Sequence, residues 1–190
     1  MSSPTTGATE AATTPVTTSA ATPAIPATTP GRTAADVANA PLVLRGRGVV
    51  PGRAEGEALV TRDRISGWGG IDSRTGTIVE TRHELRGQSF AGKVLVFPGA
   101  KGSSGWSAAF HLTRTMGTAP AAMLFNEMTT KIALGAVVTR APAMTDFDRD
   151  PLAVIETGDW VVVDADRGIV EVRKRARPAP GVAADAAPRA

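Results

Sequence analysis

The sequence predicts an α+β fold in which short strands outnumber helices and the helices cover one face of a sheet. Three observations favour it. Apolar runs of four or five residues recur along the middle of the chain, a length typical of strands. A glycine-rich turn joins one such run to a segment of helical character at 108–116. The segment 165–168 separates two further apolar runs in the way that is typical of a β-hairpin.

The two ends of the chain differ in composition from its middle. Residues 1–40 are rich in threonine, alanine and proline, lack aromatic residues, and carry only the charges of Glu10, Arg32 and Asp36. Such a segment buries too little apolar surface to offset the entropy of ordering it, so we expect a disordered tail. Residues 174–190 are rich in arginine, proline and alanine and are expected to form a basic flexible tail. The predicted domain is therefore 41–173.

The first half of this domain is predicted to consist of strands joined by glycine-rich turns. The runs 42–50, 57–61 and 77–80 have the length and apolar content of strands. Glycine clusters at 52–56 and 65–72 predict a turn and a sharply bent loop between them. A polar connection at 83–92 leads to the apolar run 93–98, which we expect to be a buried central strand.

The second half is predicted to place one good helix and one weak helix among further strands. The helix 108–116 ends at Gly117 and is followed by a strand at 121–125. The weaker helix is expected at 128–134 and to end at Gly135. Extended segments at 136–139 and 143–145, a charged loop at 146–151, and the hairpin strands 160–164 and 169–172 complete the domain.

Composition excludes several classes of protein. The chain has no cysteine, so it forms no disulfide and offers no thiolate to an iron–sulfur cluster, and its two histidines are too few for an evident zinc site. Its net charge of +3 is carried by scattered arginines with 4% aromatic residues, which argues against a nucleic-acid partner. No apolar run approaches the ~20 residues of a membrane span, and no signal-like segment is evident, so we expect a cytoplasmic protein.

The candidate functional element is the turn at 99–107, between the central strand and the main helix. Its glycines allow the backbone to approach a ligand closely, and the helix start offers free N–H donors and a partial positive charge. Ser103 or Ser104 is placed either to cap the helix or to meet a bound anion, and the pattern alone leaves both interpretations open. Lys101 adds a positive charge that suits a substrate carboxylate.

Nine segments in order resemble the small, swivelling-domain subunit of aconitase X-type dehydratases. They lie at 56–60, 68–72, 75–76, 85–89, 92–96, 102–104, 117–122, 133–138 and 157–159, and read from Gly-Glu-Ala-Leu-Val through Gly-Ser-Ser to Thr-Gly-Asp. Together they extend over nearly all of 44–172, and their order and spacing are more specific than any single motif. The resemblance implies a swivelling β/β/α domain like the one that closes over the active site of aconitase.

The resemblance also implies a hydro-lyase subunit that is inactive without its large subunit. In this family the large subunit carries a cysteine-bound iron–sulfur cluster, whose iron would act as a Lewis acid on the departing hydroxyl. Known members dehydrate cis-3-hydroxy-L-proline or mevalonate 5-phosphate. We expect the first substrate, with pyrroline-2-carboxylate as product, and keep the second as the alternative.

Site residues follow from the same resemblance. It implies that Ser103 is the general base, and that the substrate is bound by Lys101, Gly102, Ser104, Gly69 and Gly70. Gly105 and Trp106 depart from the family's pattern, so a non-catalytic swivel or binding module stays an alternative. A carrier phosphorylated on histidine is a further alternative, which requires an exposed histidine such as His83 in its polar loop.

Overall fold

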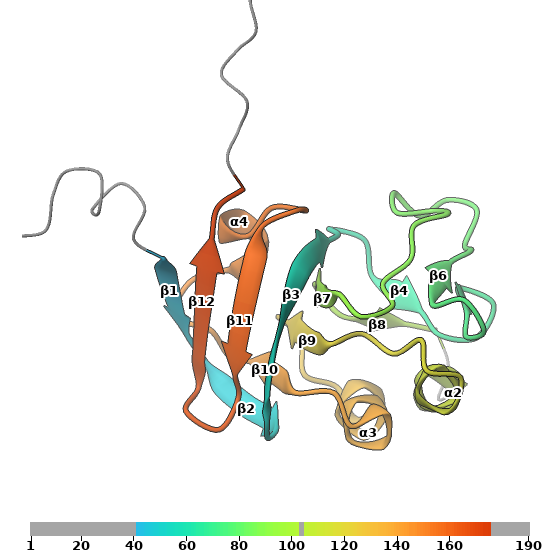
Figure 1. Ribbon diagram of the computed structural model, residues 1–190. Helices are drawn as coiled ribbons and strands as arrows, with labels where there is room; N and C mark the ends of the chain where they lie inside the picture. Colours follow the sequence, from blue (N-terminus) through green and yellow to red (C-terminus); the bar gives the residue numbers. More distant parts are fainter. Residues whose placement is uncertain (1–40, 103–104, 176–190) are drawn as a thin grey trace, which may run out of the picture.

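The computed structural model describes residues 41–102 and 105–175. Eight strands form one mixed sheet in the order β1-β12-β11-β3-β7-β9-β10-β2, and two short strand pairs, β4-β8 and β5-β6, lie beside it (Figure 1). The strands are β1 (Leu42–Arg45), β2 (Arg47–Val50), β3 (Arg53–Val60), β4 (Ile65–Ser66), β5 (Ile71–Asp72), β6 (Thr77–Ile78), β7 (Val94–Phe97), β8 (Ala100–Lys101), β9 (Ala122–Phe125), β10 (Ala143–Thr145), β11 (Trp160–Asp164) and β12 (Ile169–Arg173). The described helices are α2 (Gly105–Thr115), α3 (Thr130–Thr139) and α4 (Pro151–Val154).

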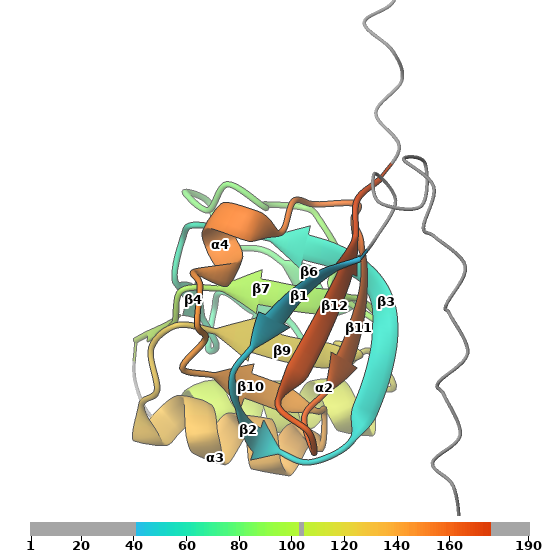
Figure 2. The same ribbon diagram turned by 90° about the vertical axis from the view of Figure 1, so that its left-hand side faces the viewer.

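The large sheet is bent so strongly that its two edges meet. β1 at one edge and β2 at the other are consecutive in the chain, with only Gly46 between them. The Gly46 N–H donates to the Gly168 carbonyl at 3.0 Å, and a Cβ at Gly46 would lie 2.6 Å from the Phe147 ring. Glycine is therefore required where the chain passes from one edge to the other. In Figure 2 the β1–β12–β11 layer lies in front of the β7–β9–β10 layer.

The central strands β7 and β9 are buried on both faces. Their side chains alternate between two apolar clusters, one between the sheet layers and one between the sheet and the helices. Val94, Val96, Ala122 and Leu124 belong to the first cluster, and Leu95, Phe97, Met123 and Phe125 to the second. Trp106, Phe110 and Ile132 supply the helix side of the second cluster. The predicted β/β/α layering is confirmed.

The parallel part of the sheet places the ends of several elements at one edge. β3, β7, β9 and β10 are neighbours in parallel, α2 connects β7 to β9, and α3 connects β9 to β10. In such strand–helix–strand units the helix runs against the strands, so both helices begin at the carboxyl ends of the strands. The turn after β7 and the loop after β9 therefore lie at the same edge of the sheet, where ligands bind in many open α/β sheets.

The predicted end of the second helix at Gly135 is wrong. α3 continues through Gly135 to Thr139, so the segment 136–139 is helical and not extended. Gly135 serves packing, because a Cβ there would lie 2.1 Å from Cζ3 of the Trp106 ring. The helix ends instead at Arg140, which has a left-handed φ of 58° and donates its N–H to the carbonyls of Ala136 and Val137.

Three other boundaries differ from the prediction. The expected turn at 52–56 is mostly strand, because β3 begins at Arg53 and only Gly52 has a positive φ (124°). The charged loop continues into the short α4, whose Asp150 carboxylate accepts the Leu152 N–H at 2.9 Å. At the end of the domain, Lys174 and Arg175 contact Asp159 and so belong to it. The rest of the two predicted tails lies outside the described residues.

No helix in the described ranges 41–102 and 105–175 is long and apolar enough to cross a membrane.

Candidate functional site

The turn after β7 is held from both sides by backbone contacts. β8 pairs in parallel with β4, and the Ile65 N–H donates to the Gly99 carbonyl at 3.1 Å. Gly102 has a φ of 85°, which glycine adopts without strain, and a Cβ there would lie 3.3 Å from Ser66 Oγ. The predicted general base Ser103 and the predicted substrate ligand Ser104 lie outside the described residues. Their roles stay predictions, as does that of Gly102.

Lys101 and Gly70, both predicted to bind substrate, are brought together by Glu80. The Lys101 ammonium lies 2.5 Å from Glu80 Oε1, and the Glu80 N–H donates to the Gly70 carbonyl at 3.2 Å. The other carboxylate oxygen, Oε2, is buried without a hydrogen-bond partner among the described residues. Glu80 thus joins the turn to the glycine-rich loop and neutralises Lys101, a role that the sequence analysis did not assign.

The glycine-rich loop 67–70 packs against the start of α2. A Cβ at Gly67 would lie 2.5 Å from the Trp106 Cα, and one at Gly70 would lie 2.2 Å from the Ser66 carbonyl oxygen. Gly69, with a φ of 75°, instead faces open space, and the neighbouring Trp68 side chain is 70% exposed. The predicted residues Gly69 and Gly70 therefore lie in a loop beside the turn, but only Gly69 is accessible.

Lys131 approaches the same turn from the first turn of α3. Its ammonium donates to the Gly102 carbonyl at 2.6 Å, and it lines a hollow of ≈ 360 Å³ together with Ser107, Thr129, Thr130 and Leu134. The sequence analysis missed Lys131, although one signal was available. A lysine in the first turn of a helix is unfavourable next to the positive end of the helix dipole, and this turn has no acidic residue to compensate it. Such an unfavourable charge can indicate a functional residue.

Trp106 is a core residue. Its side chain is fully buried, its Nε1 donates to the Ile65 carbonyl at 3.1 Å, and its ring stacks on Phe110 with a centroid distance of 4.0 Å. At this departure from the family's pattern, the side chain therefore fills the interior between α2 and α3.

His83 does not meet the requirement for a phosphorylated carrier. Its side chain is 4% exposed, and Nδ1 accepts the Leu85 N–H at 3.1 Å. Nε2 is buried without a partner in the described part of the chain. The hypothesis that His83 is an exposed phosphorylation site is wrong, because the connection that carries it packs into the domain.

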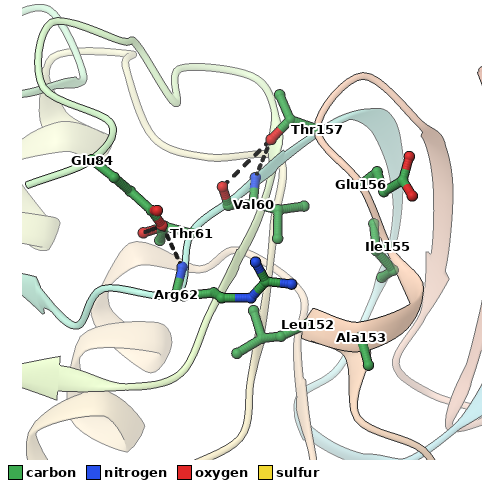
Figure 3. A pocket seen from close by; sticks show the side chains of 9 residues that line it. All are labelled: Val60, Thr61, Arg62, Glu84, Leu152, Ala153, Ile155, Glu156 and Thr157. Atoms are coloured by element: carbon green, nitrogen blue, oxygen red, sulfur yellow. Dashed lines mark hydrogen bonds between the residues drawn. The ribbon is translucent and has the colours of Figure 1, made fainter.

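A second hollow, of ≈ 250 Å³, lies at the carboxyl end of β3 (Figure 3). Glu84 closes one side of it by accepting hydrogen bonds from the Thr61 hydroxyl (2.6 Å) and the Arg62 N–H. The hydrogen bond from Thr61 is the main reason why the pKa of Glu84 lies below its ordinary value. On the other side, Thr157 Oγ1 accepts the Val60 N–H at 3.0 Å. These polar groups tie loops together.

The chain does not offer a site for an iron–sulfur cluster by itself. It contains no cysteine, and the described residues hold no group of three histidine, aspartate or glutamate side chains placed to bind a metal ion. The cluster that the resemblance implies therefore does not fit the donors of this chain.

Comparison with known proteins identifies what the chain is similar to. The aconitase X swivel domain family matches residues 43–172. The phosphomevalonate dehydratase small subunit of Archaeoglobus fulgidus is 46% identical over 126 residues, which cover 66% of this chain and 95% of that protein. The protein of the same name from Methanosarcina mazei is 39% identical over 135 residues, which cover 71% of this chain and 94% of the relative.

Two solved structures share the fold. The crystal structure of Thermococcus kodakaraensis aconitase X in its holo-form matches with a TM-score of 0.66 and 39% identity, covering 70% of this chain and 99% of that chain. The solution NMR structure of a UPF0107 protein matches with a TM-score of 0.64 and 43% identity, covering 70% of this chain and all (100%) of that one.

Proposed function

Because this chain belongs to the aconitase X swivel domain family and is a small subunit of an aconitase X-type dehydratase, we propose that it acts on mevalonate 5-phosphate. The observation that carries the proposal is the identity of 39–46% to small subunits named for phosphomevalonate dehydration, over nearly their whole length. Neither relative's name mentions cis-3-hydroxy-L-proline, so the substrate first expected from the sequence is replaced by the alternative.

The small subunit requires a large subunit to complete the active site. The name of the relatives implies such a partner, and the cysteine-free sequence leaves the iron–sulfur cluster to it. In the complex, each subunit supplies a different part of the active site. The partner holds the cluster, and this chain supplies the turn at 99–105 and the glycine-rich loop beside it. The isolated chain is accordingly inactive.

Within this division, Ser103 acts as the general base. Dehydration of a 3-hydroxy acid removes a proton from C2 and the hydroxyl group from C3. A serine hydroxyl is a poor base in water and needs positioned donors and a site closed to solvent to hold its oxygen as an alkoxide. The start of α2 supplies part of this stabilisation, because the first turn of a helix carries a partial positive charge. Lys101, Gly102, Ser104 and Gly69 form the surface that meets the substrate, and the buried Gly70 acts behind it by accepting the hydrogen bond from the Glu80 N–H.

Reconstitution tests the proposal. The full chain is co-expressed with an aconitase X large subunit, and consumption of mevalonate 5-phosphate and of cis-3-hydroxy-L-proline is measured in parallel. We expect a brown complex that dehydrates mevalonate 5-phosphate and leaves hydroxyproline unchanged, and a colourless, inactive small subunit when it is expressed alone. Turnover of hydroxyproline alone would overturn the substrate assignment, and a complex that turns over neither compound would favour a non-catalytic module.

A further inference from the structure

The first turn of α3 carries a positive charge at a place where a helix favours a negative one. Lys131 is the second residue of α3, and neither α2 nor α3 has an acidic residue in its first turn. The start of a helix already bears a partial positive charge, so Lys131 lowers the stability of α3. A local rule that is broken in this way is typical of a functional position.

Lys131 is held at the turn and keeps its charge unneutralised. Its ammonium donates to the Gly102 carbonyl at 2.6 Å, which uses one of its three N–H donors. In the described part of the chain no carboxylate lies within 4.0 Å of it, whereas the neighbouring Lys101 is paired with Glu80 at 2.5 Å. Of these two lysines at the turn, Lys131 is the one without an ion-pair partner among the described residues.

A second polar group without a partner lies beside Lys131. Thr129 is the N-cap residue of α3, yet its side chain makes no capping hydrogen bond. Its Oγ1 is buried and has no hydrogen-bond partner among the described residues. A buried hydroxyl left unpaired costs stability, which a bound acceptor would restore. Thr129 and Lys131 line the same hollow of ≈ 360 Å³, in which Leu134 provides an apolar wall.

We propose that Lys131 and Thr129 bind the phosphate end of the substrate, an inference that rests on the proposed function. A phosphate monoester brings a charge of about −2 and several acceptor oxygens, which match an unpaired ammonium and an unpaired hydroxyl. The apolar wall at Leu134 suits the alkyl chain between the phosphate and the hydroxy-acid end. Lys131 thereby determines specificity for the phosphorylated over the unphosphorylated hydroxy acid.

The test compares variants of the full chain in complex with the large subunit. Lys131→Met removes the charge and keeps the length of the side chain. We expect KM for mevalonate 5-phosphate to rise roughly 10- to 100-fold with kcat little changed, as for the loss of one charge-assisted hydrogen bond used in binding. Activity on unphosphorylated mevalonate should be unaffected, and Lys131→Arg should restore most of the affinity. Lys93→Met is the matched control, because Lys93 pairs with Glu57 at 3.1 Å on β3, and it should change nothing.

A second readout separates this inference from the proposed function. The dissociation constant of n-butyl phosphate, a probe that cannot be dehydrated, is measured by calorimetry on the same complexes and should rise with Lys131→Met. Lys131-dependent binding of the probe without turnover of mevalonate 5-phosphate would support the phosphate site and refute the proposed function. If an active Lys131→Met complex keeps the wild-type KM for mevalonate 5-phosphate, the phosphate site is refuted. An equal loss of activity on mevalonate 5-phosphate and on unphosphorylated mevalonate would refute it as well. If Lys131→Met does not assemble, Thr129→Val removes only the hydroxyl and should raise KM alone.

Discussion

At the scale of single residues, the charged side chains around the turn at Gly102 form ion pairs that hold its backbone in place. Glu80 neutralises Lys101 and donates its N–H to the Gly70 carbonyl, so it fixes the lysine against the loop that contains Gly70. Its second carboxylate oxygen is buried without a hydrogen-bond partner among the described residues. Arg64 and Glu127 form another ion pair at the same edge, and the Glu127 N–H donates to the Pro98 carbonyl at 2.9 Å. Paired charges of this kind orient the backbone of the turn.

The sharpest residue-scale prediction concerns Ser103. Ser103→Ala removes one oxygen, so the complex should assemble with unchanged cluster absorbance. If Ser103 is the general base, turnover should fall by roughly 10² to 10⁴. If it only caps α2, the change should be about 1 kcal/mol of stability with activity retained. Ser104→Ala is the control and should reduce turnover less. Solvent-deuterium exchange into C2 of the substrate should disappear with Ser103→Ala, and near wild-type turnover would falsify the assignment.

Asp159 shows how a buried carboxylate supports the end of the domain. Burial raises its pKa, but hydrogen bonds from the Glu156 N–H, the Lys174 ammonium and the Arg175 N–H outweigh this effect, so the pKa of Asp159 lies below its ordinary value. The unfolded chain therefore takes up the proton at a higher pH than the folded one. The stabilisation is complete above the ordinary aspartate pKa of about 4 and is lost as the pH falls through the lower folded value.

The substitution Asp159→Asn should remove the stabilisation that the ionised Asp159 gives to the folded chain. We expect a loss of about 2 kcal/mol at pH 7, because two backbone donors and an ammonium lose their charged acceptor. The difference from the wild-type chain should shrink as the pH is lowered below 4, because position 159 of the unfolded wild-type chain then takes up a proton, and it should be lost once the folded Asp159 is protonated as well. Thermal unfolding between pH 7 and pH 3 measures both effects. Glu171→Gln, on the outer face of β12, is the control and should shift the melting temperature little at any pH.

At the scale of elements, the packing of α2 on α3 depends on a large side chain in one helix that lies against a glycine in the other. The Trp106 ring of α2 occupies the space that a side chain at position 135 of α3 would need. The sequence alone suggested the opposite, since glycine inside a helical pattern usually marks its end. The error could not be avoided from local pattern, because the reason for Gly135 lies in a residue of another helix.

Gly135→Ala should therefore behave unlike an ordinary helix substitution. Alanine in place of glycine normally stabilises a helix by up to about 1 kcal/mol. Here the added methyl group would lie 2.1 Å from the Trp106 ring, and overpacking of this kind costs about 1 to 3 kcal/mol. Denaturant unfolding should show a net loss, which Trp106→Leu in the same chain should partly reverse. Val137→Ala, at an exposed position of α3, should be neutral or slightly stabilising, and a stabilised Gly135→Ala would contradict the packing argument.

The elements that were predicted correctly are those whose pattern is visible in their own residues. β7 and β9 are buried on both faces, so they appear as unbroken apolar runs, and the β11–β12 hairpin is marked by its turn. The turn at Gly102 is likewise visible from its glycines. Lys131 is separated from Gly102 by 29 residues, and only the parallel arrangement of β7 and β9 brings them together. The position of Lys131 in the candidate site therefore depends on the order of the strands in the sheet, which no local sequence motif predicts.

At the scale of the whole molecule, elements between β1 and β12 supply both apolar clusters. The last described residues, Lys174 and Arg175, form hydrogen bonds with Asp159. Nothing in either cluster calls for apolar side chains from residues 1–40, whose composition predicts disorder.

Deletion of residues 1–33 should accordingly leave the domain unchanged. The melting temperature and the affinity for the large subunit are expected to equal those of the full chain, because the removed segment has no apolar periodicity with which to pack. Differential scanning calorimetry and titration with the large subunit measure these quantities. A decrease of several degrees would show that the segment contributes to the folded structure and that the domain begins earlier than residue 41.

The junction at Gly46 has a consequence for how the protein is made. β1 comes first among the described strands and its partner β12 comes last, so their pairing must wait until β12 has left the ribosome. Until then β1 and β2 cannot both be fixed at opposite edges, and the apolar faces of β7 and β9 remain partly uncovered. Closure of the sheet is thus a long-range step that follows the synthesis of every described strand, and such non-local pairing is expected to slow folding.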